Sequence, residues 1–162
     1  RVPDAPLYTL FPRAVGANPT PIAFAEVYLA LQNKTVDAQE NPLPTIEAKK
    51  FYEVQSHINL TGHITDALLT IIGGPLCAKL SDADKKTFTA VYREAAARAT
   101  AEIIESEKKL MVDFAKRGKT VVKVDRKPFI AAVQKYYKEG KQPDGNALPW
   151  PKDIYDKLQA IK

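Results

Sequence analysis

The chain has 162 residues, of which 45% are hydrophobic and 27% are charged, and its formal net charge is +5. This balance is typical of a folded domain, or of a piece of a larger protein, and excludes a disordered chain. The basic residues are scattered rather than gathered in a stripe, so we expect no nucleic-acid partner. No apolar run approaches the roughly 20 residues of a membrane span, and we expect no stable membrane insertion.

The sequence contains few residues that could carry metal or nucleophilic chemistry. Cys77 is the only cysteine, so the chain forms no internal disulfide, and His57 and His63 have no cysteine partners for a structural zinc ion. There is no Gly-x-Ser-x-Gly motif and no Gly-rich phosphate loop. We therefore predict no catalytic residue, no bound metal and no cofactor.

Short strands alternate with helices in the first part of the chain. Pro12 predicts a break in the first helix, and Gly16 its end. The predicted elements are a strand end at 1–3, a helix at 6–15, a strand at 20–23, a helix at 24–32, a strand at 35–39 and a helical turn at 45–51.

A polar tip, Gln39-Glu40-Asn41, follows the predicted strand at 35–39. In open α/β sheets, small ligands bind at the carboxyl ends of the strands. Pro42 restricts Asn41 to an extended conformation, which holds its amide beside the strand tip. Such an amide can both donate to and accept from a carboxylate or a hydroxyl group.

The second part contains an apolar stretch and one very long helix. The residues from Ser81 to Asp84 supply an N-cap and early acidic residues, and we expect the helix to continue to about Lys116. At 1.5 Å per residue its length is roughly 50 Å, longer than a small domain is wide, so it is expected to join two lobes. The other predicted elements are a strand at 57–60, a central strand at 67–72, a strand at 120–124, a helix from Pro128 to about Tyr137 and a last helix opened by Pro151.

Several separate motifs resemble, in the same order, the DctP-type substrate-binding proteins of TRAP transporters, which capture organic acids outside the bacterial inner membrane. The motifs are Arg1-Val-Pro3, residues 18–31, Val36 to Pro42, Lys50 to Gln55 and Leu60 to His63. The resemblance implies an α/β, periplasmic-binding-protein-like fold of two lobes. This chain would hold mostly the second lobe and a long helix that spans both lobes.

The same resemblance divides the chain into three parts. Residues 1–66 would begin the second ligand-binding lobe. Residues 67–116 would hold a strand that returns to the first lobe and the spanning helix, and residues 117–162 would complete the second lobe with a C-terminal helix. It also implies a periplasmic protein whose signal peptide and first lobe lie upstream of this sequence.

Five residues are candidates for binding the ligand. By the resemblance, the planar guanidinium fork of Arg1 pairs with the ligand carboxylate. Asn41 would add hydrogen bonds, Phe24 would pack against an apolar side of the ligand, and His63 would line the pocket. Asp4 stands where related sequences often have Asn. Their structural alternatives are a surface salt bridge for Arg1, a turn cap for Asn41, a core position for Phe24 and a structural role for His63.

The leading hypothesis is a receptor that binds a small organic acid and delivers it to the membrane permease subunits of a TRAP transporter. One alternative is an α/β enzyme acting on a small carboxylic acid, for which only His63 and Glu40 are candidates, without visible partners. Asp37 and Glu40 stand three apart on a predicted strand, so they would face opposite sides rather than form a catalytic pair. A helical interaction module built on the long helix is the third possibility.

Overall fold

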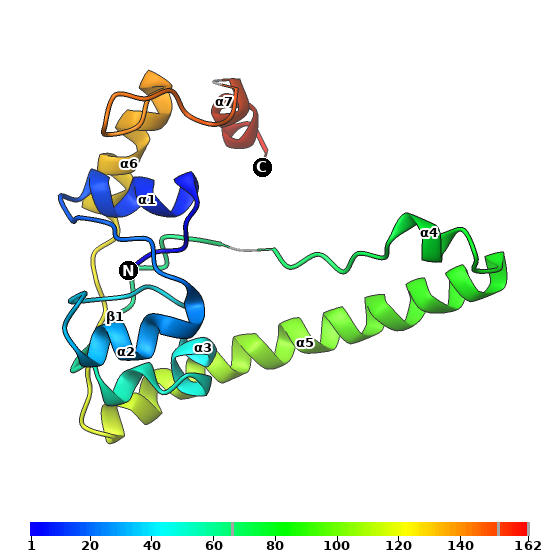
Figure 1. The fold of residues 1–162 in the computed structure, drawn as a ribbon, viewed down its shortest axis with the longest axis horizontal. Coiled ribbons are helices and arrows are strands. Elements are labelled where there is room, and N and C mark those ends of the chain that lie inside the picture. Colours follow the sequence, from blue (N-terminus) through cyan, green and yellow to red (C-terminus); the bar gives the residue numbers. More distant parts are fainter. Residues whose placement is uncertain (66, 152, 162) are drawn as a thin grey trace.

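The computed structural model describes residues 1–65, 67–151 and 153–161. A compact body holds the N-terminus, and residues 67–105 form a long arm that projects from it (Figure 1). The expected boundary between the first two parts of the chain falls at Asp66, outside the described residues. The last helix, which Pro151 was expected to open, begins at Asp153 among the described residues, and Lys152 lies outside them.

The body consists of short helices around a small sheet. Before the arm, the elements are α1 (Pro6–Ala14), η1 (Phe24–Glu26), α2 (Val27–Gln32), α3 (Leu43–Ala48), η2 (Phe51–Glu53) and β1 (His57–Asn59). The arm contains α4 (Gly74–Cys77) and most of α5 (Asp82–Lys116). After it come β2 (Thr120–Val122), α6 (Lys127–Glu139) and α7 (Asp153–Gln159).

The two strands pair in parallel, with Ile58 opposite Val121. Ladder bonds continue past both ends, since the Leu60 amide donates to the Val122 carbonyl and the Thr120 amide to the Ser56 carbonyl. Parallel strands need a long crossover, and here the arm provides it. The predicted α/β class is confirmed, and both strands lie where the sequence placed them.

The strands expected at 1–3 and 20–23 are reduced to one parallel bridge between Val2 and Pro21. The Val2 amide donates to the Thr20 carbonyl, and the Ile22 amide donates to the Val2 carbonyl. The backbone nitrogen of Pro21 faces away from Val2, because the two bonds of the bridge come from its neighbours, so a proline is tolerated at this position.

Two other strand predictions are wrong. Residues 35–39 form no strand. The Arg1 terminal ammonium donates a hydrogen bond to the Ala38 carbonyl of this segment. Residues 67–72 also form no strand, and Leu68 is 90% exposed. A strand needs a neighbour for its backbone groups, and no described strand pairs with either segment.

The long helix follows the local signals closely. Ser81 is its N-cap, and the Ser81 hydroxyl accepts a hydrogen bond from the Asp84 amide. Gly118 lies just after the C-cap with a φ of +78°, in the left-handed region that glycine adopts without steric cost. In contrast, Pro12 does not interrupt α1, because it removes only one donor close to the helix end.

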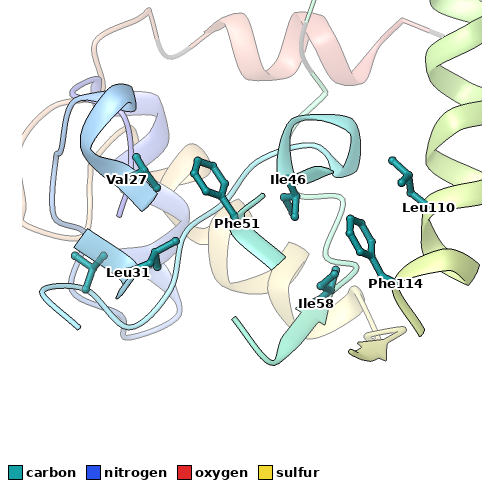
Figure 2. Packing of buried hydrophobic residues seen from close by; sticks show 8 residues of the cluster. Val27, Leu31, Ile46, Phe51, Ile58, Leu110 and Phe114 are labelled. Atoms are coloured by element: carbon teal, nitrogen blue, oxygen red, sulfur yellow. The ribbon is translucent and has the colours of Figure 1, made fainter. Parts of the chain in front are cut away.

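The hydrophobic core lies where α2, α3, β1 and the end of α5 meet (Figure 2). Phe114 and Val27 are fully buried, and Phe51 is almost so. The buried members of this core are Val27, Leu31, Val36, Ile46, Phe51, Ile58, Leu110 and Phe114. The core thus anchors only the last two turns of α5.

The arm leaves a large apolar surface exposed. No described residue between 67 and 105 is buried. The large exposed side chains of this part are Leu68, Leu69, Ile71, Ile72, Leu76, Phe88, Val91, Tyr92, Ile103 and Ile104. Exposed apolar surface of this extent indicates an interaction site. None of the described helices is long and apolar enough to cross a membrane.

Candidate functional site

A cleft of about 880 Å³ runs along β1 and past its carboxyl end. Its walls come from the chain start, from α1 and the loop after it, from residues 35–41 and from the stretch 51–63. The polar tip that the sequence singled out is therefore part of the cleft wall. The part of the cleft past the carboxyl end of β1, where Thr61 and His63 lie, agrees with the general location of ligand sites in α/β folds.

Arg1 lies in this cleft, partly buried. Its Nε donates a hydrogen bond of 2.9 Å to the Ile22 carbonyl, which fixes the direction of the guanidinium. No carboxylate of the described residues forms an ion pair with this group within 4.0 Å. Burial lowers the pKa of Arg1, and the charge of Glu40 opposes that shift, but a guanidinium remains protonated.

Asn41 lines the same cleft, directly before Pro42 and α3. Its Nδ2 donates a hydrogen bond of 2.6 Å to Gln39 Oε1. This contact orients the Asn41 amide and uses only one of its hydrogen-bonding positions. The amide can thus still accept or donate a bond toward the cleft.

His63 also lines the cleft and packs against α1. Its ring stacks on Phe11 with 4.3 Å between the ring centroids, and Thr61 Oγ1 lies 2.7 Å from Nδ1. His63 Nε2 is 3.9 Å from Glu40 Oε2, which is too long for a hydrogen bond. The two residues that sequence analysis left without visible partners are therefore neighbours.

Lowering the pH should destabilise the protein through His63. Burial lowers the pKa of His63 below its ordinary value of 6.5, so the unfolded chain binds a proton more readily than the folded protein. The free energy of unfolding should fall as the pH drops through 6.5 toward the folded pKa. Urea denaturation at several pH values should show this fall in the wild type and a smaller fall in His63→Gln.

The exposed His57 provides the matched control for that experiment. His57→Gln should keep the pH dependence of the wild type, because it leaves the Phe11 and Thr61 contacts of His63 in place. An identical pH dependence in His63→Gln and the wild type would contradict the prediction.

Phe24 and Asp4 are not among the residues that line the cleft. Phe24 is 42% exposed and meets Phe51, which does line it, with 6.1 Å between ring centroids at an angle of 81°. Asp4 is exposed. The structure thus brings Arg1, Asn41 and His63 together and places Phe24 at the margin.

Sequence analysis placed Gln39 in the polar tip without giving it a role, and it did not single out Thr61 or Phe11. Gln39 stands two residues before Asn41, Thr61 stands two residues before His63, and each forms a hydrogen bond with that residue. Period-two spacing along an extended segment could therefore have found them. Phe11 gave no such signal, because only the packing of α1 places it on His63. Within the described parts of the chain, no group of three or more His, Cys, Asp or Glu residues could hold a metal ion.

Comparison with known sequences gives a consistent result. The profile of the family described as bacterial extracellular solute-binding protein, family 7 (DctP), matches residues 1–142. The sialic acid-binding periplasmic protein SiaP of Vibrio cholerae is 42% identical over 139 residues, covering 86% of this chain and 43% of that protein. The chain thus spans less than half the length of this relative.

Solved structures show the same fold. A TRAP periplasmic solute-binding protein from Roseobacter denitrificans, with bound 3-deoxy-D-manno-oct-2-ulosonic acid, superposes with a TM-score of 0.84 at 30% identity. The match covers 100% of this chain and 52% of the other. A similar protein from Polaromonas, bound to D-erythronate, has a TM-score of 0.74 at 40% identity, covering 78% of this chain and 42% of that one.

Proposed function

Since this chain belongs to the bacterial extracellular solute-binding protein family 7, we propose that the full-length protein is a periplasmic receptor for a small organic acid. It would deliver that acid to the membrane permease subunits of a TRAP transporter. One observation carries the proposal: the guanidinium of Arg1 is partly buried in a cleft, without a carboxylate partner within 4.0 Å among the described residues.

The chemistry of the cleft favours a carboxylate as the missing partner. A charge removed from water needs an opposite charge and hydrogen bonds to offset its desolvation. The bond from Arg1 Nε to Ile22 leaves the two terminal nitrogens of the guanidinium to grip both oxygens of a carboxylate. Asn41 would add a hydrogen bond beside it, and His63 would contact a polar part of the ligand.

The remaining two candidates would act at the margin of this site. Phe24 is exposed beside the cleft residue Phe51 and would cover an apolar side of the ligand once the protein closes. Asp4 would influence which acid binds through its negative charge. Neither role requires the side chain to line the open cleft.

A second lobe would complete the binding site. In the division proposed here, residues 1–66 and 117–162 build one lobe, and residues 67–116 cross to the other lobe and return. The exposed apolar residues of the arm support this division, because they offer a surface for such a lobe. Closure of two lobes around the ligand would remove water, and the acid would favour closure only by binding the closed form more tightly.

The test is calorimetric titration of the full-length protein with a panel of acids and matched neutral amides. The panel should include sialic acid, sugar acids such as galactonate and erythronate, C4-dicarboxylates and aromatic acids. We expect one class of acids to bind and its amides to fail. At one hundred times its dissociation constant, such an acid should add about 2.7 kcal/mol to the free energy of unfolding.

The same experiment separates a receptor from an enzyme. A receptor releases its ligand unchanged, so the bound acid should be recovered intact after long incubation. Equal binding of acids and amides would contradict the carboxylate site. Conversion of the acid into another compound would favour the enzyme hypothesis, with His63 and Glu40 as the first residues to examine.

A further inference from the structure

Two positive side chains share one aromatic ring at the edge of the cleft. The Cζ atom of Arg1 lies 5.9 Å from the centroid of the Phe24 ring, and the Nζ atom of Lys49 lies 5.5 Å from the same centroid. Both distances fall within the range of cation–π attraction. The ring therefore places a second cation close to the proposed carboxylate-binding arginine.

Local structure determines the position of Lys49. The helix α3 begins directly after Asn41 and Pro42 and ends at Ala48, so Lys49 is its C-cap. Six helical residues span about 9 Å, which keeps Lys49 near the cleft. The next residue, Lys50, has a φ of +55°, in the left-handed region, and the buried side chain of Phe51 then anchors this segment in the core.

No carboxylate of the described residues neutralises the charge of Lys49. Among the described residues, no carboxylate lies within 4.0 Å of its ammonium group. Lys49 is exposed, and contact with the Phe24 ring can hold its ammonium group at the edge of the cleft. An exposed, unpaired ammonium group at this place can meet a negative group of a ligand.

We propose that Lys49 is a specificity-determining residue that favours acids with a second negative group, a carboxylate or a phosphate, distant from the carboxylate held by Arg1. This inference rests on the proposed function and deepens it by naming the substrate class. Arg1 would hold the first negative group inside the cleft. Lys49, at the edge of the cleft, would attract the second negative group of the ligand through a short-range charge interaction, partly weakened by water.

The test compares a singly and a doubly charged ligand of the same size in the full-length protein. Galactonate and galactarate are such a pair, since galactarate has a second carboxylate in place of the terminal hydroxymethyl group; another sugar acid from the panel and its oxidised counterpart serve equally. The measured quantity is the ratio of the two dissociation constants. In Lys49→Gln, the preference for the doubly charged acid should fall roughly three- to tenfold.

Three comparisons make this result specific to the charge of Lys49. Lys49→Arg retains the cation and should retain the preference of the wild type. Lys50→Gln removes a charge from the neighbouring exposed residue and should also retain it. In the wild type, the preference should shrink at high salt, because ions screen charges at the surface.

An unchanged preference in Lys49→Gln would overturn the inference. Equal weakening of both ligands would overturn it too, because that result indicates a structural role for the contact with Phe24. These outcomes differ from failure of the proposed function, in which the wild-type protein binds no acid at all.

Discussion

Replacing Arg1 by alanine should weaken binding of the acid ligand by a factor of roughly thirty to several thousand. Truncating one partner of a desolvated, hydrogen-bonded charge pair costs about 2–5 kcal/mol, and every 1.4 kcal/mol is tenfold in affinity. Much of this cost arises because the ligand carboxylate would enter the cleft without its partner. Titration calorimetry with the best acid of the panel measures the effect directly.

Two further variants define what Arg1 contributes. Arg1→Lys keeps the positive charge but loses the planar fork, so its affinity should lie between those of the wild type and Arg1→Ala. Arg13→Ala removes an arginine of α1 that pairs with Asp144 and does not line the cleft, and it should bind as the wild type does. Wild-type affinity in a correctly folded Arg1→Ala protein would refute the carboxylate site.

Replacing Phe114 by alanine should cost about 3–5 kcal/mol of the free energy of unfolding. Phe114 is fully buried near the end of α5, and its ring centroid lies 5.5 Å from that of Tyr52. Figure 2 shows it beside Ile46 and Ile58, so it joins α5 to α3 and β1. Its removal leaves a cavity where the arm is anchored, and denaturation with urea should show the loss.

The matched control lies on the same helix. Val112 is 54% exposed, and Val112→Ala should change the free energy of unfolding by no more than about 0.5 kcal/mol. A similar small effect in Phe114→Ala would show that the end of α5 is not held by this core. Ligand affinity should change less than stability, because Phe114 does not line the cleft.

The sequence by itself determined most of the helices, although it did not predict the short helix α4. The Ser81 cap and Gly118 bracket α5, and Gly140, with a φ of +69°, ends α6. A helix satisfies its backbone hydrogen bonds within one segment, so local signals suffice to place it. The motif match also drew attention to Arg1, Asn41 and His63, which line one cleft.

Tertiary structure alone decided which extended segments became strands and what surrounds each candidate residue. Residues 67–72 have strand-forming composition, yet strand formation depends on a partner from elsewhere in the chain, and no described strand pairs with them. For the same reason, the contacts of His63 with Phe11 and Glu40 were not visible in the sequence. Contacts between distant segments arise only when packing brings those segments together, and no local pattern encodes them.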